Sequence, residues 1–335
     1  MNKKFEIYAP VVIPTLCRYE HLKRCVDSLR KCEGSEYTDL YIGLDYPSKE
    51  SHWSGYKKIC EYLNTINGFS KVVVIKRETN YGPEQNLKDL RKLVNSLYDR
   101  CIVSEDDNEF SPNFLDYMNW GLIQFQSNPE IIRICGTKMT WGVDFQRIMR
   151  GYPFNIFPAK DFNASGYGLW FDKDYVIPYT KESILKSWRL SFLAIQKGYC
   201  SAISRMLYQL HKESQLPDVC IRLYCAFHNK YCIFPSVSKV KNWGYDGTGV
   251  NSDKNKHLID IQELDSMHSF NMDSIEIKDY PEVVSYVKAM YGGRTITRIS
   301  VVLRYIFYRI TKKNSAKTVA YLKSLLARVR STQDK

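Results

Sequence analysis

The chain has 335 residues, of which 44% are hydrophobic and 25% are charged, as is ordinary for a globular protein with one large domain or two smaller ones. No apolar run approaches the roughly 20 residues that cross a bilayer, and a predicted strand begins within a few residues of Met1, so the sequence predicts neither a spanning helix nor a signal peptide. The formal net charge is +12, but residues 294–335 alone carry eleven Lys or Arg residues and one acid. Because the basic residues concentrate in this tail, nucleic acid is not an expected partner of the rest of the protein.

The ten cysteines are scattered along the chain. No two of them have Cys-x-x-Cys spacing, and several, such as Cys101 and Cys135, lie inside apolar segments. This pattern favours reduced, mostly buried thiols in a cytosolic protein over disulfides or a zinc site.

The first hundred residues alternate between apolar runs and segments with apolar residues at helical spacing. We expect strands at 8–14, 40–44, 71–75 and 101–103, and helices between them at 18–32, 51–66 and 83–98. Strands rich in Val and Ile that are separated by helices predict a mostly parallel sheet, buried on both faces.

The pattern is less regular after residue 110. We expect a helix capped by Ser111-Pro112, a strand at 131–135, loops with short strands at 136–180, helices near 181–196 and 216–230, an irregular Gly-rich segment at 236–258, and tail helices at about 295–311 and 315–330. The sequence thus predicts an α/β protein in three consecutive segments, 1–135, 136–260 and a basic helical extension at 261–335.

Acidic side chains follow two of the predicted strands. Asp45 comes directly after the strand at 40–44, and Ser104-Glu105-Asp106-Asp107 follows the strand at 101–103. In open α/β sheets, ligands bind at the carboxyl ends of the strands. Neighbouring carboxylates at that edge suit a hard divalent cation such as Mg²⁺ or Mn²⁺, which in turn binds phosphates. A solvated acidic loop is the alternative interpretation.

The motifs of two large nucleotide-binding classes are absent from the sequence. It has neither Gly-x-Gly-x-x-Gly after the first strand nor Gly-x-x-x-x-Gly-Lys-Ser/Thr, which argues against dinucleotide enzymes and P-loop NTPases. Instead, the strands lead into Ile13-Pro14-Thr15-Leu16-Cys17-Arg18, Asp45, the segment 80–86 and the Glu-Asp-Asp triplet. This ordered set resembles the GT-A fold glycosyltransferases, in particular the bacterial family-2 type and the N-acetylglucosaminyltransferase I group. The resemblance covers roughly residues 8–252, and its most specific part is the segment 103–114.

The resemblance implies a Rossmann-like GT-A domain that binds a nucleotide diphosphate sugar, with UDP as the expected nucleotide, in its first half and the acceptor in its second. Asp107, the last acid of the triplet, would be a direct ligand of Mn²⁺ or Mg²⁺. Asp106 would contact the ribose or the metal's waters, and Glu105 would support the loop. The chemistry agrees, because a bound cation stabilises the charge that grows on the leaving diphosphate.

Further donor contacts are implied at Pro14, Thr15, Arg18 and Asp45. Asp45 would accept a hydrogen bond from the base or the ribose, and Arg18 would meet the phosphate or the base. A turn-forming aspartate before Tyr46-Pro47 and a surface arginine are the structural alternatives.

Two other segments lie where the relatives contact the donor. Gln85, with Tyr81 and Asn86 beside it, is one candidate, although a loop and a helix cap would explain these residues equally well. Trp170, in a segment similar to the family's Gly-x-Gly-Trp, would line the donor sugar, and a core aromatic is the alternative.

An inverting transfer needs a base that takes the proton of the acceptor hydroxyl. Asp218 is the candidate, because it opens a predicted helix as the base does in the relatives, although an aspartate also stabilises a helix N-terminus by itself. The chain lacks the paired acids and the tryptophan of many relatives, and Glu213 is the substitute candidate. The loop at 243–252 resembles one that orders over bound nucleotide, and His257 could complete the metal site, although a lone histidine is more often a surface residue.

The tail carries an apolar stripe at Ile296, Ile299, Leu303, Ile306 and Ile310. A basic helix with such a stripe suits the surface of an anionic membrane, and packing on the body or nucleic-acid binding are the alternatives. We therefore expect a metal-dependent, inverting hexosyl- or N-acetylhexosaminyltransferase. It would act on a glycan or lipid-linked acceptor at the cytoplasmic face of the membrane, in the synthesis of a bacterial surface polysaccharide. A nucleotidyltransferase on a similar sheet and a non-enzymatic membrane- or RNA-binding protein are the competing hypotheses.

Overall fold

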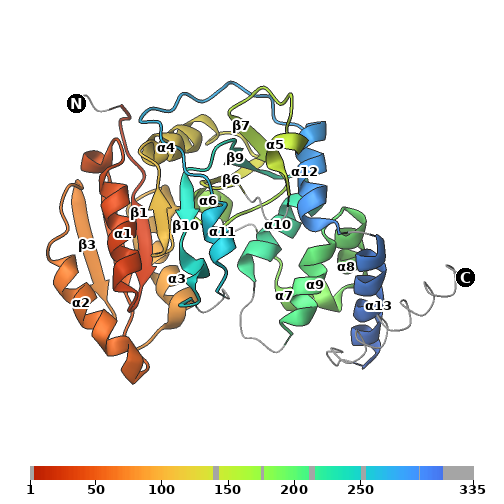
Figure 1. Cartoon of the computed structure of the whole chain (residues 1–335), viewed down its shortest axis with the longest axis horizontal. Coiled ribbons are helices and arrows are strands. Elements are labelled where there is room, and N and C mark those ends of the chain that lie inside the picture. The colour runs from red at the N-terminus through yellow and green to blue at the C-terminus, as the bar shows by residue number, and fades with distance from the viewer. Residues whose placement is uncertain are drawn as a thin grey trace, which may run out of the picture. The chain divides into compact units, whose positions relative to one another are not determined.

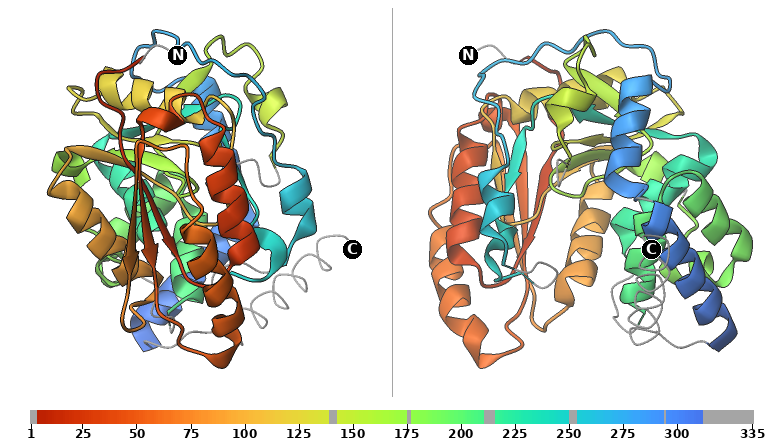
Figure 2. Two further views of the ribbon diagram at one scale, coloured as in Figure 1. Left: turned by 90° about the vertical axis from the view of Figure 1, so that its left-hand side faces the viewer. Right: turned by 45° about the vertical axis from the view of Figure 1, so that its right-hand side comes forward.

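The computed structural model describes residues 4–138, 143–174, 177–210, 216–249, 254–293 and 295–311. The chain forms two compact units (Figures 1 and 2). The first unit comprises residues 1–141, 151–176 and 231–278, and the second comprises 142–150, 177–230 and 279–335. The two units are interleaved along the chain, and the assignment of functions to three consecutive segments stays a prediction.

The first unit is built on an eight-stranded sheet with the strand order β3-β2-β1-β4-β8-β6-β9-β7 (Figure 1). The strands are β1 (Val11–Thr15), β2 (Asp39–Leu44), β3 (Lys71–Lys76), β4 (Arg100–Val103), β6 (Ile131–Cys135), β7 (Ile156–Ala159), β8 (Tyr167–Trp170) and β9 (Tyr231–Pro235). Neighbours among β3, β2, β1 and β4 are parallel, and so are β6 and β9, whereas β8 and β7 are antiparallel to their neighbours. The predicted α/β class with a mostly parallel sheet is confirmed.

The helices of this unit are α1 (Tyr19–Arg30), α2 (Trp53–Leu63), α3 (Gly82–Asn95), α4 (Phe114–Gln124), α6 (Phe171–Asp174) and α11 (Lys256–Asp260). A small second sheet pairs β5 (Asn108–Phe110) with β10 (Val240–Asn242) in antiparallel register. The expectation that residues 236–258 are irregular is therefore wrong in part, because β10 and α11 lie in this segment. Pairing with β5, far away in the sequence, supplies the hydrogen bonds that local propensity does not predict.

Side chains alternate between the two faces of β1 and β2, as strand geometry requires. Val11 and Ile13 share a buried cluster with Leu22 and Val26 of α1. On the opposite face, Gly43 of β2 lies so close to α3 that a Cβ atom there would come within 3.1 Å of a Leu90 methyl group. Figure 2 shows these strands running between α1 on one side and α3 on the other. Helices therefore cover both faces of the sheet at β1 and β2, which leaves the strand ends there accessible to a ligand.

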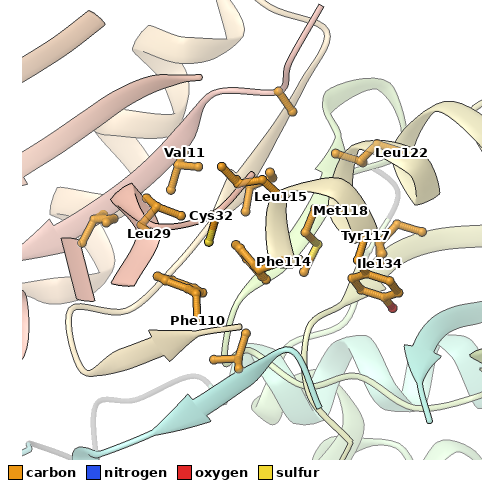
Figure 3. Packing of buried hydrophobic residues seen from close by; sticks show 14 of the residues in the cluster. Val11, Leu29, Cys32, Phe110, Phe114, Leu115, Tyr117, Met118, Leu122 and Ile134 are labelled. Carbon is orange, nitrogen blue, oxygen red and sulfur yellow. The ribbon is translucent and has the colours of Figure 1, made fainter. Parts of the chain in front are cut away.

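A hydrophobic cluster supports the segment that follows β4. Phe110 of β5 stacks on Phe114 of α4 with 4.3 Å between ring centroids. Leu29 of α1 and Cys32, which follows the helix, pack beside this pair (Figure 3). The acidic residues after β4 are thus held between two anchored points, the buried strand before them and Phe110 after them.

The second unit is helical in its described residues. Its helices are α5 (Phe145–Ile148), α7 (Lys181–Lys186), α8 (Trp188–Gln196), α9 (Cys200–Tyr208), α10 (Pro217–His228), α12 (Pro281–Tyr291) and α13 (Thr295–Thr311). The sequence predicted the helices near 181–196, 216–230 and 295–311 but not α9 or α12. The expected helix at 315–330 lies outside the described residues.

Helix α13 packs on the second unit through one face. Val301 and Tyr305 are buried, and the Tyr305 hydroxyl donates to the carbonyls of Leu185 and Ser187 at 3.2 and 3.1 Å. The Tyr305 ring meets Trp188 edge-on at 5.2 Å. In the parts of the chain that the structure describes, no helix has both the length and the apolar character needed to span a bilayer.

All ten cysteines are free thiols, and eight of them are buried. The prediction that the cysteines are mostly buried is confirmed. Burial raises the pKa of the Cys101 thiol to about 12, so this side chain acts as a small apolar core residue.

Candidate functional site

The order of the strands places one ligand-binding edge in the first unit. From β1 the chain continues through β2 and β3 on one side, whereas β4 pairs with the other side of β1. The direction of the strand order thus reverses between β1 and β4, and in open α/β sheets ligands bind in the crevice at the carboxyl ends of such a strand pair. Thr15 ends β1, and Asp106 follows β4 by three residues. The site that the sequence predicted lies at this reversal.

Asp106 is fixed by residues from the end of β1. Its carboxylate accepts a hydrogen bond from the Thr15 hydroxyl at 2.8 Å and another from the Arg18 guanidinium. Asp106 is 5% exposed. Burial raises the pKa of Asp106, the Asp107 carboxylate adds to this increase, and the charge of Arg18 opposes it. The site therefore holds two close carboxylates and needs positive charge to keep both of them ionised.

Asp107 shares the same arginine. Arg18 Nη1 lies 2.8 Å from Asp107 Oδ2, and Asn242 of β10 donates to Asp107 Oδ1 at 3.1 Å. The main-chain N–H of Trp243 donates to the Asp107 carbonyl at 2.8 Å. A Cβ atom on Gly244 would come within 2.3 Å of Asp107 Oδ2, so a larger residue there would displace the Asp107 side chain. The residues after β10 thus form one wall of the acidic site.

Residues on one face of α1, and in the turn before it, contact this wall. His21 Nε2 lies 3.1 Å from Asp246 Oδ2, and the Arg24 guanidinium lies 4.3 Å above the Trp243 ring. Trp243 Nε1 donates to Glu109 at 2.7 Å. Residues 18, 21 and 24 are three apart, so they follow one another along the same side of the helix. The described part of the predicted nucleotide loop, residues 243–249, is therefore tied to the acidic site by α1 and β5.

Charge around Asp246 also favours its ionised form. Partial burial alone would raise the pKa of Asp246, but hydrogen bonds from Thr248 and the charges of His21 and Arg18 outweigh it and lower the pKa. The other expected loop residues, 250–252, lie outside the described residues.

The residues present fit a divalent cation. Asp106 and Asp107 offer hard oxygen ligands, and a guanidinium already draws on both, which shows that their arrangement attracts a cation. Among the described residues there is no group of three or more His, Cys, Asp or Glu side chains that could share a metal ion. His257, an exposed residue of α11, is thus not grouped with the two aspartates as the sequence predicted. Mg²⁺ needs no such group, because one or two carboxylates, waters and substrate phosphates commonly complete its coordination.

Asp45 lies at the same edge of the sheet, and its N–H donates to the Thr15 carbonyl at 2.8 Å. Its buried carboxylate accepts from the N–H groups of Tyr46, Tyr81 and Gly82 at 2.8 to 2.9 Å and from Asn80 at 3.3 Å. These four hydrogen bonds use the acceptor sites of a carboxylate and stabilise the start of α3. The geometry thus corresponds to the structural alternative, and nucleotide binding by Asp45 stays a prediction.

The other expected donor residues near β1 and α3 differ in accessibility. Pro14 is partly buried within β1. Gln85 is exposed on α3 and donates to Asp89 at 2.7 Å, and Tyr81 is 41% exposed with the Arg77 guanidinium 4.9 Å from its ring. Asn86 is buried and donates to the Gly43 carbonyl at 2.8 Å. Its side chain joins α3 to β2, which leaves Gln85 and Tyr81 as the accessible candidates of this segment.

Trp170 belongs to the core of the first unit. It is 1% exposed at the end of β8, its indole N–H donates to the Leu122 carbonyl at 3.0 Å, and Lys173 Nζ lies 4.0 Å from its ring. The core interpretation fits this geometry, and contact with a donor sugar would require β8 to move. Its assignment to the donor site stays a prediction that the observed packing does not favour.

Asp218, the candidate base, belongs to the second unit. It opens α10 directly after Pro217, and Arg205 of α9 pairs with its carboxylate at 2.8 Å. About a quarter of the side chain is exposed, so a proton donor can reach it. Glu213, the substitute candidate, lies outside the described residues.

Sequence reasoning missed two residues of the acidic site, Asn242 and His21. The Gly-rich loop after residue 242 was noticed, but its pairing with β5 was not. The signal available was the short alternation Val240-Lys241-Asn242 before Trp243-Gly244, which is typical of a strand that ends in a tight turn.

No family model and no curated protein sequence matches the chain. Among solved structures, it is similar to TarS from S. aureus, with 15% identity and a TM-score of 0.35 over 53% of this chain and 31% of that one. It thus spans about a third of that protein. It is also similar to the mannosyltransferase PcManGT from Pyrobaculum calidifontis in complex with GDP-Man and Mn²⁺, with 10% identity and a TM-score of 0.38 over 67% and 71% of the two chains. Mouse xyloside xylosyltransferase 1 shows 12% identity and a TM-score of 0.35 over 67% and 83%. Likenesses this distant carry no inference about activity.

Proposed function

We propose that the protein is a metal-dependent, inverting glycosyltransferase of the GT-A type. It would move a hexosyl or N-acetylhexosaminyl group from a nucleotide diphosphate sugar, with UDP as the expected nucleotide, to a hydroxyl of a glycan or lipid-linked acceptor. We place this reaction in the synthesis of a bacterial surface polysaccharide at the cytoplasmic face of the membrane.

One observation carries the proposal. Two buried aspartates, Asp106 and Asp107, lie at the point where the strand order reverses between β1 and β4, and Arg18 bridges them. A solvated acidic loop, the simpler interpretation of the sequence, would leave both carboxylates in water. Burying two like charges costs free energy unless cations balance them, so this arrangement is suited to hold a cation and a polyphosphate.

Asp107, with Asp106 beside it, would hold Mg²⁺ or Mn²⁺. The bound ion would act as a Lewis acid for the charge that grows on the leaving diphosphate. Thr15 and Arg18 keep Asp106 in place through their hydrogen bonds, and Arg18 adds a further positive charge close to the same phosphates. The wall made by Asn242, Trp243 and Gly244 holds the Asp107 side chain in one rotamer. Less side-chain conformational entropy would therefore be lost when a metal ion binds.

Asp218 would accept the proton of the acceptor hydroxyl as it attacks the anomeric carbon. The Arg205 guanidinium keeps this carboxylate oriented at the start of α10. The hydroxyl oxygen forms the new glycosidic bond, the bond between the anomeric carbon and the phosphate oxygen breaks, and its electron pair leaves with the nucleoside diphosphate.

Calorimetric titration of UDP in the presence of Mn²⁺ tests the donor site directly. We expect Asp107→Asn to weaken UDP binding at least ~10-fold, because a charge-assisted interaction worth about 1.5–3 kcal/mol is lost. Asp260→Asn, which changes an exposed aspartate of α11, serves as the control and should bind UDP normally. Equal binding by wild type and Asp107→Asn would contradict the metal assignment.

A second measurement tests the base. Asp218→Asn should keep wild-type affinity for UDP with Mn²⁺ but lose transfer by about 100-fold or more, the usual contribution of a general base. An unchanged rate of transfer would exclude Asp218 from that role.

A further inference from the structure

The second unit contains a pocket of about 390 Å³ between α9, α12 and α13, which is within the size range of small-molecule sites. No acidic residue is among the described residues that line this pocket. Hydroxyl and guanidinium groups line one part of it, and apolar side chains line another: Ser201, Ser204, Arg205, Met290, Val301 and Arg304.

Arg304 provides a positive charge that pairs with no acidic side chain among the residues that the structure describes. Its side chain is partly buried on α13, and its Nη1 donates only to the Ser204 hydroxyl, at 3.3 Å, among the contacts of the described residues. Burial lowers the pKa of Arg304. Guanidinium pKa values lie so high that the group stays charged. A partly buried charge of this kind attracts an anion.

Arg205 provides a second guanidinium on the facing helix. It is exposed and pairs with Asp218 through Nη1, and its guanidinium carries further N–H donors that can meet a ligand. Ser204 and Arg205 follow Ser201 by three and four residues on α9, so both lie on the side of the helix that Ser201 occupies. Two guanidinium groups and two hydroxyl groups thus converge from α9 and α13.

The rest of the lining decides what kind of anion fits. Met290 of α12 and Val301 of α13 present apolar groups to the same cavity. A free inorganic anion would leave this surface in contact with water. An anion that carries an alkyl group would cover it, and each buried methylene group would tighten binding about fourfold.

We propose that this pocket binds the phosphate group of an alkyl phosphate ester, with the phosphate at Arg304, Arg205 and Ser204 and the alkyl part against Met290 and Val301. Phosphate suits the lining better than a carboxylate, because its oxygens can accept from two guanidinium forks and a hydroxyl at once. Two sources share this chemistry, namely the headgroup of a membrane lipid and the phosphate of a soluble ester.

A consequence for Asp218 rests on the proposed function. A phosphate at Arg205 would compete for the donors that now orient Asp218. An acceptor that bears a phosphate would then bind beside the candidate base and change its hydrogen bonding. The pocket itself needs neither the donor nor the metal, so its test is independent of the acidic site.

The experiment measures binding of monomeric octyl phosphate to the full-length protein by calorimetry, without nucleotide or metal. Inorganic phosphate and octyl glucoside, tested in parallel, report the phosphate and the alkyl chain separately. We expect octyl phosphate to bind at least ~10-fold more tightly than either, because both parts of the lining contribute. Arg304→Gln should weaken this binding about 10-fold or more, which corresponds to the loss of one charge-assisted hydrogen bond.

Two further variants make the result decisive. Ser201→Trp places a bulky side chain at an exposed position of the pocket rim and should block binding without removing a charge. Arg189→Gln on α8 removes an exposed arginine outside the pocket and should leave binding unchanged. Equal weakening by Arg304→Gln and Arg189→Gln, or no binding of octyl phosphate at millimolar concentration together with no Arg304-dependent binding to vesicles, would overturn the proposal.

Vesicles distinguish the two sources. Binding to phosphatidylcholine vesicles that contain phosphatidic acid, lost in Arg304→Gln while octyl phosphate in solution shows no binding, would assign the pocket to a lipid headgroup. Arg304-dependent binding of octyl phosphate in solution would assign it to a soluble ester. Wild-type affinity of Arg304→Gln for UDP with Mn²⁺ separates either result from the proposal for the acidic site.

Discussion

Arg18 decides the electrostatic balance of the acidic site. It is the residue that contacts both Asp106 and Asp107, and the pKa of Asp106 is raised even with this arginine in place. Without the guanidinium, two buried carboxylates would face each other across a few ångströms. The arginine and a bound divalent cation would therefore interact with the same carboxylate oxygens of Asp106 and Asp107.

We predict that Arg18→Gln destabilises the protein by about 3 kcal/mol in the absence of divalent cations, the lower end of the cost of breaking a buried ion pair. Magnesium should restore roughly 1.4 kcal/mol at a concentration about tenfold above its dissociation constant, because it binds the folded state only. Urea unfolding with and without magnesium measures both effects.

Arg24→Gln is the matched control for this prediction. Arg24 lies on the same side of α1 but contacts the Trp243 ring and not the aspartates. Its replacement should cost little stability and show no more magnesium response than the wild type. An equal response of both variants would mean that the cation binds elsewhere.

At the scale of single residues, the sequence predicts which side chains lie at the strand ends better than it predicts which residues they contact. Thr15, Arg18, Asp106 and Asp107 lie together, because parallel strands bring their carboxyl ends to one edge; their roles in donor and metal binding stay predictions. Asn242 reaches Asp107 through a strand pairing across 134 positions, and no local pattern encodes that contact. Trp170 shows the opposite case, since the same Gly-rich aromatic segment is compatible with a binding surface or with the core.

At the scale of elements, helices and strands with strong periodicity were predictable. Leu90 and Val94 of α3 are buried as their spacing indicates, whereas Leu93 is 38% exposed. A helix covers the sheet with one stripe only, and position 93 lies just outside that stripe. Elements whose stability comes from distant partners, such as β10 and α12, gave no comparable signal.

The segment after α11 shows how such distant partners hold the site. Asp265 receives hydrogen bonds from Lys239, next to β10, and from Asn113 before α4, the latter at 3.1 Å. Burial alone would raise the pKa of Asp265, but the hydrogen bond from Lys239 and those from Met267 and Asn113 lower it. Burial lowers the pKa of Lys239, and the hydrogen bond and negative charge of Asp265 partly offset this decrease.

We predict that Asp265→Asn costs about 3 kcal/mol at pH 7, because it leaves the buried Lys239 charge without its partner. The folded-state pKa of Asp265 lies below the unfolded value, so its stabilisation is present above the unfolded pKa, near 4, and is lost as the pH falls through the folded pKa. The difference in unfolding free energy between wild type and Asp265→Asn should therefore shrink between pH 5 and pH 2. Asp260→Asn should show no such difference, and a difference independent of pH would refute the ionic explanation.

At the scale of the whole molecule, the candidate residues fall in two units that the chain visits alternately. The aspartates that would hold the metal belong to the first unit, and Asp218 belongs to the second. Patterns along the sequence identified both sets, but no such pattern shows that residues 142–150 leave the first unit or that residues 231–278 return to it. The acidic site could be located because ligands of open α/β sheets bind at the carboxyl ends of the strands. No comparable rule says where a catalytic base lies in a helical unit.

The tail was predicted to contact an anionic membrane through an apolar stripe, and the structure shows what α13 presents. Ile299, Leu303 and Ile310 are 46%, 37% and 75% exposed, and Ile306 is half-buried. The side chain of Ile296 and the basic residues 312–335 lie outside the described residues. The buried face of α13 consists of other residues, Val301 and Tyr305, so the exposed stripe can change without loss of packing.

We predict that Ile299→Ser with Leu303→Ser reduces co-sedimentation with phosphatidylglycerol vesicles several-fold, because membrane-surface helices bind in proportion to the apolar area they insert. High salt should weaken the remaining binding, which would depend on Lys and Arg. These point substitutions test membrane binding more specifically than truncation at Gly293 would, because truncation would also remove Val301 and Tyr305 from the packed unit. Ile123→Ser, at an exposed isoleucine of α4, should not alter binding. If the double variant co-sediments as well as the wild type, α13 does not insert, and the stripe is only an exposed part of a packed helix.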